Sequence, residues 1–265
     1  MYSFFKKLFG TLVSFLTFGC FNFQKDTIGE RDIVKEIELS KGLEEISGIF
    51  YQEPFIYAQQ DEKAVIYQIN TETNEKQKLI NIDKLGDYED ITLVDNLFYL
   101  MQSDGSILEI KDNNNFKEYP SDFSKLEFEG MCLSNDKKDL ILAVKDWNRQ
   151  EKEIILHSFH LATKTFSSTP YLIIDKNAND IDKDFKPSGI VQLPNNNFYI
   201  ISSVSKEFIE ITASGELVKK LKLDKKLFPQ AEGLSLGKTG FIYISNEKTK
   251  KDASLYEISV EKFDK

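Results

Sequence analysis

Short stretches of alternating apolar and polar residues run through the chain from about residue 32 to its end. One composite pattern occurs five times: a serine or carboxylate, then glycine or aspartate, an apolar run, a turn, and a second apolar run ending in polar residues. The copies start at residues 45, 88, 128, 187 and 231 and read EISGIFYQEPFIYAQQD, YEDITLVDNLFYLMQSD, FEGMCLSNDKKDLILAVKD, PSGIVQLPNNNFYIISSVS and AEGLSLGKTGFIYISNE. Such alternation, bounded by Asn, Asp, Gly and Ser clusters, predicts half-buried β-strands.

The spacing of the copies is that of a repeated structural unit. The equivalent positions are separated by 42, 40, 59 and 44 residues, and they are Gly48, Asp90, Gly130, Gly189 and Gly233. A period of this size is typical of the blades of a β-propeller. Each repeat continues with a third alternating segment, starting at 64, 106, 153, 207 and 254, and the first four continue with a fourth, starting at 75, 116, 169 and 217.

The fifth repeat lacks a fourth strand, whereas the strand-like segment DIVKEIELS, from residue 32, has no partner before the first repeat. We therefore expect an all-β fold, a five-bladed β-propeller of four-stranded blades, closed by this N-terminal strand in the last blade. Closure removes an exposed sheet edge. Six blades are the alternative, because the third repeat is longer than its neighbours. We assign its extra length to two loops, DWNRQEKE after residue 145 and DKNANDIDKDFK after residue 174.

The N-terminus has the order of an export signal. Lys6 and Lys7 precede an apolar run over 8–18, which is too short to span a bilayer, and Gly19-Cys20 follows. This predicts a lipoprotein signal peptide over 1–19, a lipidated Cys20 with a spacer over 20–30, and a single propeller domain over 31–265. The alternative is a plain signal peptide cut nearby. The protein would then face the periplasm or the cell surface of a bacterial envelope, anchored to a membrane through its acyl chains.

Charge narrows the range of partners. The formal net charge is −9, and without the two lysines of residues 1–19 the remainder carries 32 basic against 43 acidic side chains, or −11. Nucleic acid and anionic lipid surfaces are disfavoured, while cations and basic partners suit this charge. Two cysteines cannot form a disulfide framework. We expect a monomer.

The residue before each repeated glycine is the first candidate for a functional side chain. Glycine there is explained by the convergence of innermost strands, where a Cβ would clash. The preceding residues would converge on one channel mouth, with Asp90 beside them in the repeat that lacks glycine; they are Ser47, Glu89, Glu129, Ser188 and Glu232. Glu89, Asp90, Glu129 and Glu232 form a candidate Ca²⁺ site, because Ca²⁺ prefers clustered oxygen ligands. The alternative is a structural role in which these carboxylates accept backbone amides of the next blade.

Polar pairs at the ends of the second strands form a second candidate set. In antiparallel hairpins these ends lie at the same face as the starts of the first strands, so both sets would surround one opening. The residues assigned to ligand binding in this way are Gln60, Asp61, Lys145, Asp146, Asn246 and Glu247, together with Ser47 and Ser188. Lys145 would either neutralise Glu129 or contact an anionic group. The alternative is solvated turns.

Other reactive residue types show no catalytic arrangement. His157 and His160 lie three apart on a predicted strand, so they face opposite sides. Cys132 falls in an apolar run, where a small thiol packs well. Trp147 could stack on a ligand or cap a blade. We assign no catalytic residue.

The segments EISGI, YEDI, FEGM, PSGI and QAEGL, followed by FIYISNE, resemble the SdiA-regulated family of envelope propellers, which includes YjiK-like and calcium-regulated CarP proteins. The second repeat departs from the commoner EGI by reading EDI. The resemblance implies an exported or membrane-anchored propeller that is compared with phytase-like propellers. We expect a non-enzymatic lipoprotein that binds Ca²⁺, a small ligand or an envelope protein. The alternative is a metal-dependent phytase-like phosphoester hydrolase, which needs several basic residues where the sequence supplies Lys145.

Overall fold

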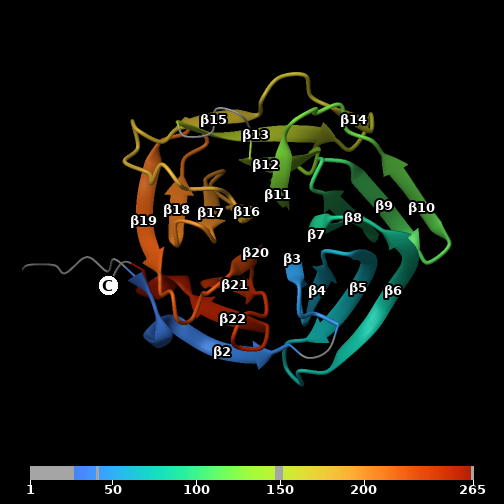
Figure 1. Cartoon of the computed structure of the whole chain (residues 1–265), viewed down its shortest axis with the longest axis horizontal. Coiled ribbons are helices and arrows are strands. Elements are labelled where there is room, and N and C mark those ends of the chain that lie inside the picture. Colours follow the sequence, from blue (N-terminus) through green and yellow to red (C-terminus); the bar gives the residue numbers. More distant parts are fainter. Residues whose placement is uncertain (1–26, 40–41, 147–151, 264–265) are drawn as a thin grey trace, which may run out of the picture.

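Five β-sheets stand in a ring around a central axis (Figure 1). The computed structural model describes residues 27–39, 42–146 and 152–263. The expected five-bladed β-propeller is confirmed, and the six-bladed alternative is wrong. Besides strands, the described residues contain the 3₁₀ turns η1 (Glu30–Asp32) and η2 (Val260–Lys262). Within the same ranges no helix is long and apolar enough to cross a membrane.

Each blade is a meander whose first strand lies nearest the axis. Blade one contains β3 (Ile46–Gln52), β4 (Phe55–Gln60), β5 (Lys63–Asn70) and β6 (Lys76–Leu85). Blade two contains β7 (Tyr88–Val94), β8 (Leu97–Gln102), β9 (Ile107–Asp112) and β10 (Asn115–Tyr119). Blade three contains β11 (Glu127–Leu133), β12 (Asp139–Asp146) and β13 (Glu153–His160), with both β14 (Thr165–Phe166) and β15 (Leu172–Asp175) paired to β13. Blade four contains β16 (Gly189–Gln192), β17 (Phe198–Ser202), β18 (Glu207–Ile211) and β19 (Leu217–Leu223).

Blade five closes the ring with the N-terminal strand. It contains β20 (Ala231–Leu236), β21 (Phe241–Asn246), β22 (Ser254–Ser259) and, as its outer strand, β2 (Ile33–Glu38). β2 pairs antiparallel with β22, with Glu36 opposite Tyr256 and Glu38 opposite Ser254. The sequence-based expectation for this closure is confirmed.

A second N-terminal pairing was not foreseen. β1 (Thr27–Ile28) runs parallel to β19 and extends blade four, and Ile28 is fully buried in the core between blades four and five. Residues 27–28, which are part of the expected spacer over 20–30, therefore pair with the propeller. The physical reason is that the buried side chain of Ile28 completes the core beside the closing blade.

The extra length of the third repeat lies in β14 and in the connection from β15 to β16. In that connection the buried Lys176 donates to the carbonyls of Lys183 (3.1 Å) and Phe185 (2.6 Å). A buried ammonium is tolerated where carbonyls satisfy it. The connection is therefore a loop, as expected, and the two hydrogen bonds of Lys176 hold it in place. The other expected loop, after residue 145, lies partly outside the described residues.

The apolar core is divided among the five contacts between neighbouring blades. One cluster fills each contact: for example, Ile66 of blade one meets Ile91 and Leu100 of blade two. The contact between blades five and one includes Ile37 of β2 and Ile46 of β3. Each blade is therefore held by both of its neighbours, and the ring depends on its closing blade.

Close packing near the axis explains the repeated glycines. A Cβ at Gly48 would come within 2.5 Å of the Cα of Asp90, and one at Gly233 within 2.7 Å of the carbonyl oxygen of Ser47. Both distances are too short for real atoms, so the adjacent innermost strands can approach only where a side chain is absent. The expectation that crowding requires glycine is confirmed for Gly48, Gly189 and Gly233; at Gly130 a Cβ would lie 3.0 Å from a methyl group of Ile190, a tight contact but not a collision with backbone.

Replacing Ile28 by alanine tests whether residues 27–28 belong to the fold. We expect Ile28→Ala to lower the free energy of unfolding by about 2–5 kcal/mol, because it opens a cavity in the core. Val34, which is 54% exposed on β2, supplies the control. Val34→Ala should change the free energy of unfolding by less than about 0.5 kcal/mol. Urea denaturation of the purified proteins measures both. Equal, small effects would show that residues 27–28 are a spacer after all.

Candidate functional site

The starts of the first strands and the ends of the second strands meet at one end of the axis. Ile46 is opposite Gln60 in blade one, Tyr88 opposite Gln102 in blade two, and Ala231 opposite Asn246 in blade five. Between them lies a cavity of about 350 Å³, which we call the channel mouth. Its lining residues are Ser47, Asp61, Asp87, Glu89, Ser103, Glu127, Phe128, Glu129, Lys145, Gln230, Glu232 and Glu247.

Both candidate sets contribute to the channel mouth, although not every predicted residue does. The predicted residues that line it are Ser47, Asp61, Glu89, Glu129, Lys145, Glu232 and Glu247. They come from blades one, two, three and five. Blade four contributes no lining residue, because its equivalent serine, Ser188, donates a hydrogen bond to blade five instead.

Asp90, predicted as a metal ligand, is occupied by backbone contacts. One carboxylate oxygen accepts the N–H of Ile91 (2.7 Å) and the other that of Met131 on the first strand of blade three (2.6 Å). The side chain is 2% exposed and does not line the channel mouth. For Asp90 the structure shows the alternative role, a link to the next blade.

Four residues predicted to bind ligand also lie elsewhere. The Ser188 hydroxyl donates to the carbonyl of Ala231 (2.7 Å), which joins blades four and five. The Gln60 side chain accepts the N–H of Glu62 (2.9 Å). Two further residues serve other sites: Asp146 pairs with Lys186 (2.6 Å), and Asn246 lines a different cavity.

Sequence reasoning missed several lining residues that a simple rule would have found. Asp87, Glu127 and Gln230 each lie two positions before a predicted carboxylate. Residues separated by two positions share a face of an extended segment. Ser103 also lines the mouth, and its hydroxyl donates to Asp87 (2.6 Å). The channel mouth is therefore lined by more acidic residues than the repeated pattern alone indicates.

The structure agrees with the expectations for His157, His160 and Cys132. His157 is 7% exposed and His160 is exposed, so they face opposite sides of β13. Cys132 is buried, and burial raises the pKa of its thiol. Cys20 and Trp147 lie outside the described residues.

Glu129 and Lys145 form an ion pair within blade three, which is one of the two roles considered for Lys145. Glu129 is 9% exposed, so its charge is nearly removed from water and Lys145 balances it. Lys145 is the one basic side chain among the described residues that line the channel mouth. The remaining carboxylates have no comparable partner cation there.

Burial and mutual repulsion disfavour the charged form of these carboxylates. Burial, then the charge of Asp87, raises the pKa of Glu89 to about 8. Burial, then the charge of Glu247, raises the pKa of Glu232 to about 8. Like charges held together in a poorly solvated space produce such shifts and are relieved by a cation.

The same effects extend to the side of the mouth formed by blades one and five. Burial, then the charge of Asp61, raises the pKa of Glu247 to about 7, and burial, then the charge of Glu45, raises the pKa of Asp61 to about 6. Gln230 donates to Glu247 from its side-chain amide. The Asp61 Oδ1 atom is buried and has no hydrogen-bond partner among the described residues. This oxygen is available to a ligand.

The arrangement is an acidic cavity rather than a finished metal centre. Within the described ranges, no three acidic, histidine or cysteine side chains stand close enough together to hold a metal ion. A cation entering the channel mouth would therefore be bound partly through water, or after Lys145 or the carboxylates shift. The chemical capacity that the geometry supports is attraction of positive charge.

Comparison with solved structures shows the fold. The chain resembles the PQQ-bound aldose sugar dehydrogenase from Streptomyces coelicolor, with a TM-score of 0.58, 9% identity, and coverage of 86% of this chain and 97% of that one. It also resembles the glutaminyl cyclase from Myxococcus xanthus, with a TM-score of 0.58, 13% identity, and coverage of 85% and 94%. At such identities the likeness concerns the fold alone.

Sequence comparison identifies the family. No curated protein matches the chain. The family model described as SdiA-regulated matches residues 32–250, which is most of the propeller and includes all five copies of the repeated pattern. The resemblance noted from the repeated segments is therefore confirmed, and the chain belongs to the SdiA-regulated family.

Proposed function

We propose that this chain is a binding protein of the bacterial cell envelope whose channel mouth takes a cation, with Ca²⁺ as the first candidate. The observation that carries the proposal is the excess of carboxylates over the single ammonium of Lys145 in one partly buried cavity. Such an excess raises the free energy of the empty cavity at neutral pH, and a bound cation lowers it.

The donor atoms suit a hard cation. Ca²⁺ binds six to eight oxygens from carboxylates, carbonyls and water. Glu89, Glu232 and Glu247 offer carboxylates, and the unpartnered Asp61 Oδ1 offers a further oxygen. Because the carboxylates are not already gathered around one point, we expect a weak site, with a Kd of about 0.1–1 mM, as in extracellular calcium modules.

Hydrolysis of phosphoesters is less well supported by the same cavity. A transferring phosphoryl group carries negative charge that several basic groups or metal ions must offset. Of the described residues lining the mouth, Lys145 alone is basic, and it is paired with Glu129. Binding is therefore the preferred proposal, and hydrolysis remains the alternative.

Anchoring through Cys20 completes the proposal. Lys6, Lys7, the apolar run over 8–18 and Gly19-Cys20 support export and lipidation. The described fold begins at Thr27. Seven residues span at most about 25 Å, so a lipidated Cys20 would hold blades four and five close to the membrane surface.

Calcium titration by calorimetry tests the channel mouth. Glu89→Gln should weaken binding about tenfold or more, because it removes one oxygen ligand and one negative charge. Glu129→Gln should also weaken binding, because it leaves the charge of Lys145 unbalanced in the channel mouth. Lys145→Met should strengthen binding, because it frees Glu129. Glu216→Gln, exposed in the turn between β18 and β19, is the matched control and should bind like the wild type. Absence of binding at millimolar calcium would contradict the proposal, and calcium-dependent turnover of phosphoesters would favour the hydrolase.

The raised pKa values also predict how stability depends on pH. Glu89 and Glu232 have pKa values of about 8 when folded and ordinary values of 4.5, so between these values the folded state binds more protons than the unfolded state. Their contribution to stability is present below about pH 4.5 and is lost as the pH rises through 8. Relative to wild type, calcium-free Glu89→Gln should therefore gain stability as the pH rises from 5 to 8. Denaturation at both pH values measures this; a difference independent of pH would contradict it.

Lipidation is tested by labelling with palmitate and by fractionation. Cys20→Ser should lose the label and leave the membrane fraction. The other cysteine provides the control, since Cys132 is buried in blade three and Cys132→Ser should remain labelled and membrane-bound. A Cys20→Ser protein that still carries label would overturn the anchor.

A further inference from the structure

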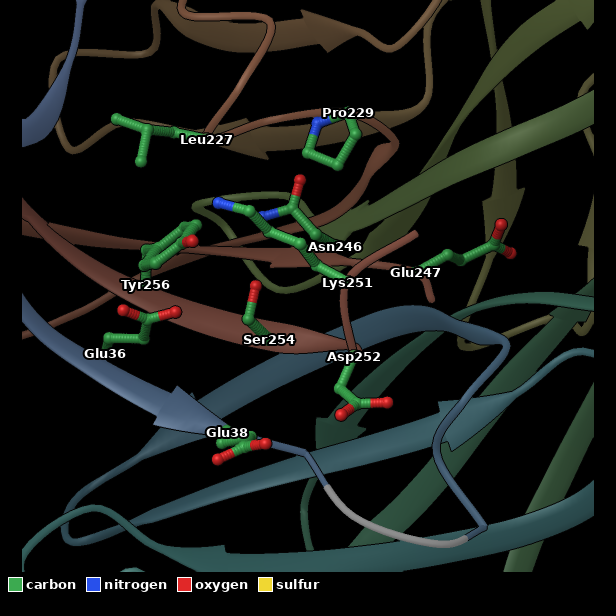
Figure 2. A pocket seen from close by; sticks show the side chains of 10 residues that line it. All are labelled: Glu36, Glu38, Leu227, Pro229, Asn246, Glu247, Lys251, Asp252, Ser254 and Tyr256. Carbon is green, nitrogen blue, oxygen red and sulfur yellow. The ribbon is translucent and has the colours of Figure 1, made fainter. Parts of the chain in front are cut away.

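A second cavity opens on blade five, away from the ring axis. It has a volume of about 540 Å³, within the usual range of small-ligand sites. Its walls are the outer strand β2, the adjoining ends of β21 and β22, and the segments 227–229 and 247–252 (Figure 2). We call it the blade-five pocket.

The floor of this pocket is a buried amide without a partner. Asn246, at the end of β21, is 1% exposed, and neither its Nδ2 nor its Oδ1 has a hydrogen-bond partner among the described residues. A buried amide that lacks partners is costly, so such groups usually meet a ligand or an ordered water. Asn246 offers donors and an acceptor side by side, which is the complement of another amide.

Four carboxylates line the pocket together with this amide. Glu36 and Glu38 lie on one face of β2, two positions apart and opposite the buried Ile37. Glu247 closes the pocket on the side toward the channel mouth and lines both cavities. Asp252 also lines the pocket but pairs with Lys248 at 2.8 Å. The carboxylates favour a ligand with positive charge.

An apolar wall faces the carboxylates. Leu227 and Pro229 form it together with Tyr256, whose ring packs edge-on against Phe228 with centroids 5.4 Å apart. A purely ionic ligand would gain nothing from this wall. A cation on a hydrocarbon stem would bury its stem there and keep its charge near Glu36 and Glu38.

The protein's own Lys251 shows that such a stem fits. Its side chain lies among the residues that line the pocket (Figure 2). The residue is exposed, and its ammonium reaches the carbonyl of Lys226 only at 3.5 Å, which is a weak contact. Lys251 therefore leaves the amide of Asn246 without a partner and can be displaced at little cost.

We propose that the blade-five pocket binds a basic side chain presented beside an amide, that is, a lysine or arginine unit, which displaces Lys251 and pairs its amide with Asn246. The source is either a free basic amino-acid derivative or a basic residue within a peptide. This site is separate from the cation site proposed at the channel mouth and does not depend on it.

Binding of three probes to the full-length protein, measured by calorimetry, tests the proposal. They are Nα-acetyl-arginine N-methylamide, butylguanidine, which lacks the amide, and Nα-acetyl-glutamate N-methylamide, which reverses the charge. We expect the arginine derivative to bind about tenfold more tightly than butylguanidine, as two amide hydrogen bonds would give, and the glutamate derivative not to bind.

Two variants should act in opposite directions. Asn246→Leu should abolish the advantage of the arginine derivative over butylguanidine while leaving stability equal or higher, because it removes an unsatisfied buried amide. Lys251→Ala should bind the arginine derivative at least about threefold more tightly, since it removes a competing cation. Glu216→Gln, exposed in the turn between β18 and β19, is the control and should bind it like the wild type. Glu247 is unsuitable for this test because it lines both cavities.

Several results would overturn the proposal: equal binding of the arginine and glutamate derivatives, an amide advantage that survives Asn246→Leu, or weaker binding by Lys251→Ala. The last test holds even if Asn246→Leu fails to fold. A tripeptide with arginine between two glycines distinguishes the sources. Binding at least about tenfold tighter than the single residue would identify a peptide, and equal binding a free derivative.

Discussion

Convergence of five innermost strands on one axis is the constraint on which the rest of this structure depends. Where adjacent first strands touch, the Cβ of an ordinary residue would collide with backbone, as at Gly48 and Gly233. The same convergence places the residues that precede these positions around a single opening. The crowding that requires glycine therefore also gathers Ser47, Glu89 and Glu232, although it does not require them to be acidic.

The carboxylates oppose the stability of the empty fold. Glu129 is balanced by Lys145, but Glu89, Glu232 and Glu247 are held in their protonated forms to a pH well above the usual range of glutamate. Five apolar clusters between the blades supply the stability against which this repulsion acts. Because the ring already holds the carboxylates together, a cation can bind to them without a rearrangement of the fold.

Blade five contributes residues to both cavities and is also the blade that closes the ring. Its outer strand β2 comes from the N-terminus, seals the core through Ile37 and presents Glu36 and Glu38 on its other face. Glu247 stands between the channel mouth and the blade-five pocket, where Gln230 donates to it. The segment that completes the propeller thus also supplies the outer binding surface.

The sequence by itself determined the strands of the repeats, although not β1 or β14, as well as the number of blades, the closing role of residues 33–38 and the convergence of Glu89, Glu129 and Glu232, because alternation and repetition are local and each copy implies the same geometry. It did not determine which polar side chains are satisfied. Asp90 and Ser188 resemble their equivalents in the other repeats, yet they accept or donate backbone hydrogen bonds across neighbouring blades. Asn246 was predicted to bind a ligand at the same opening as its equivalents, and only the packing of blade five turns it to a different cavity and leaves its amide buried without a partner. Such outcomes depend on the distances between atoms of different blades, which only the closed tertiary structure sets.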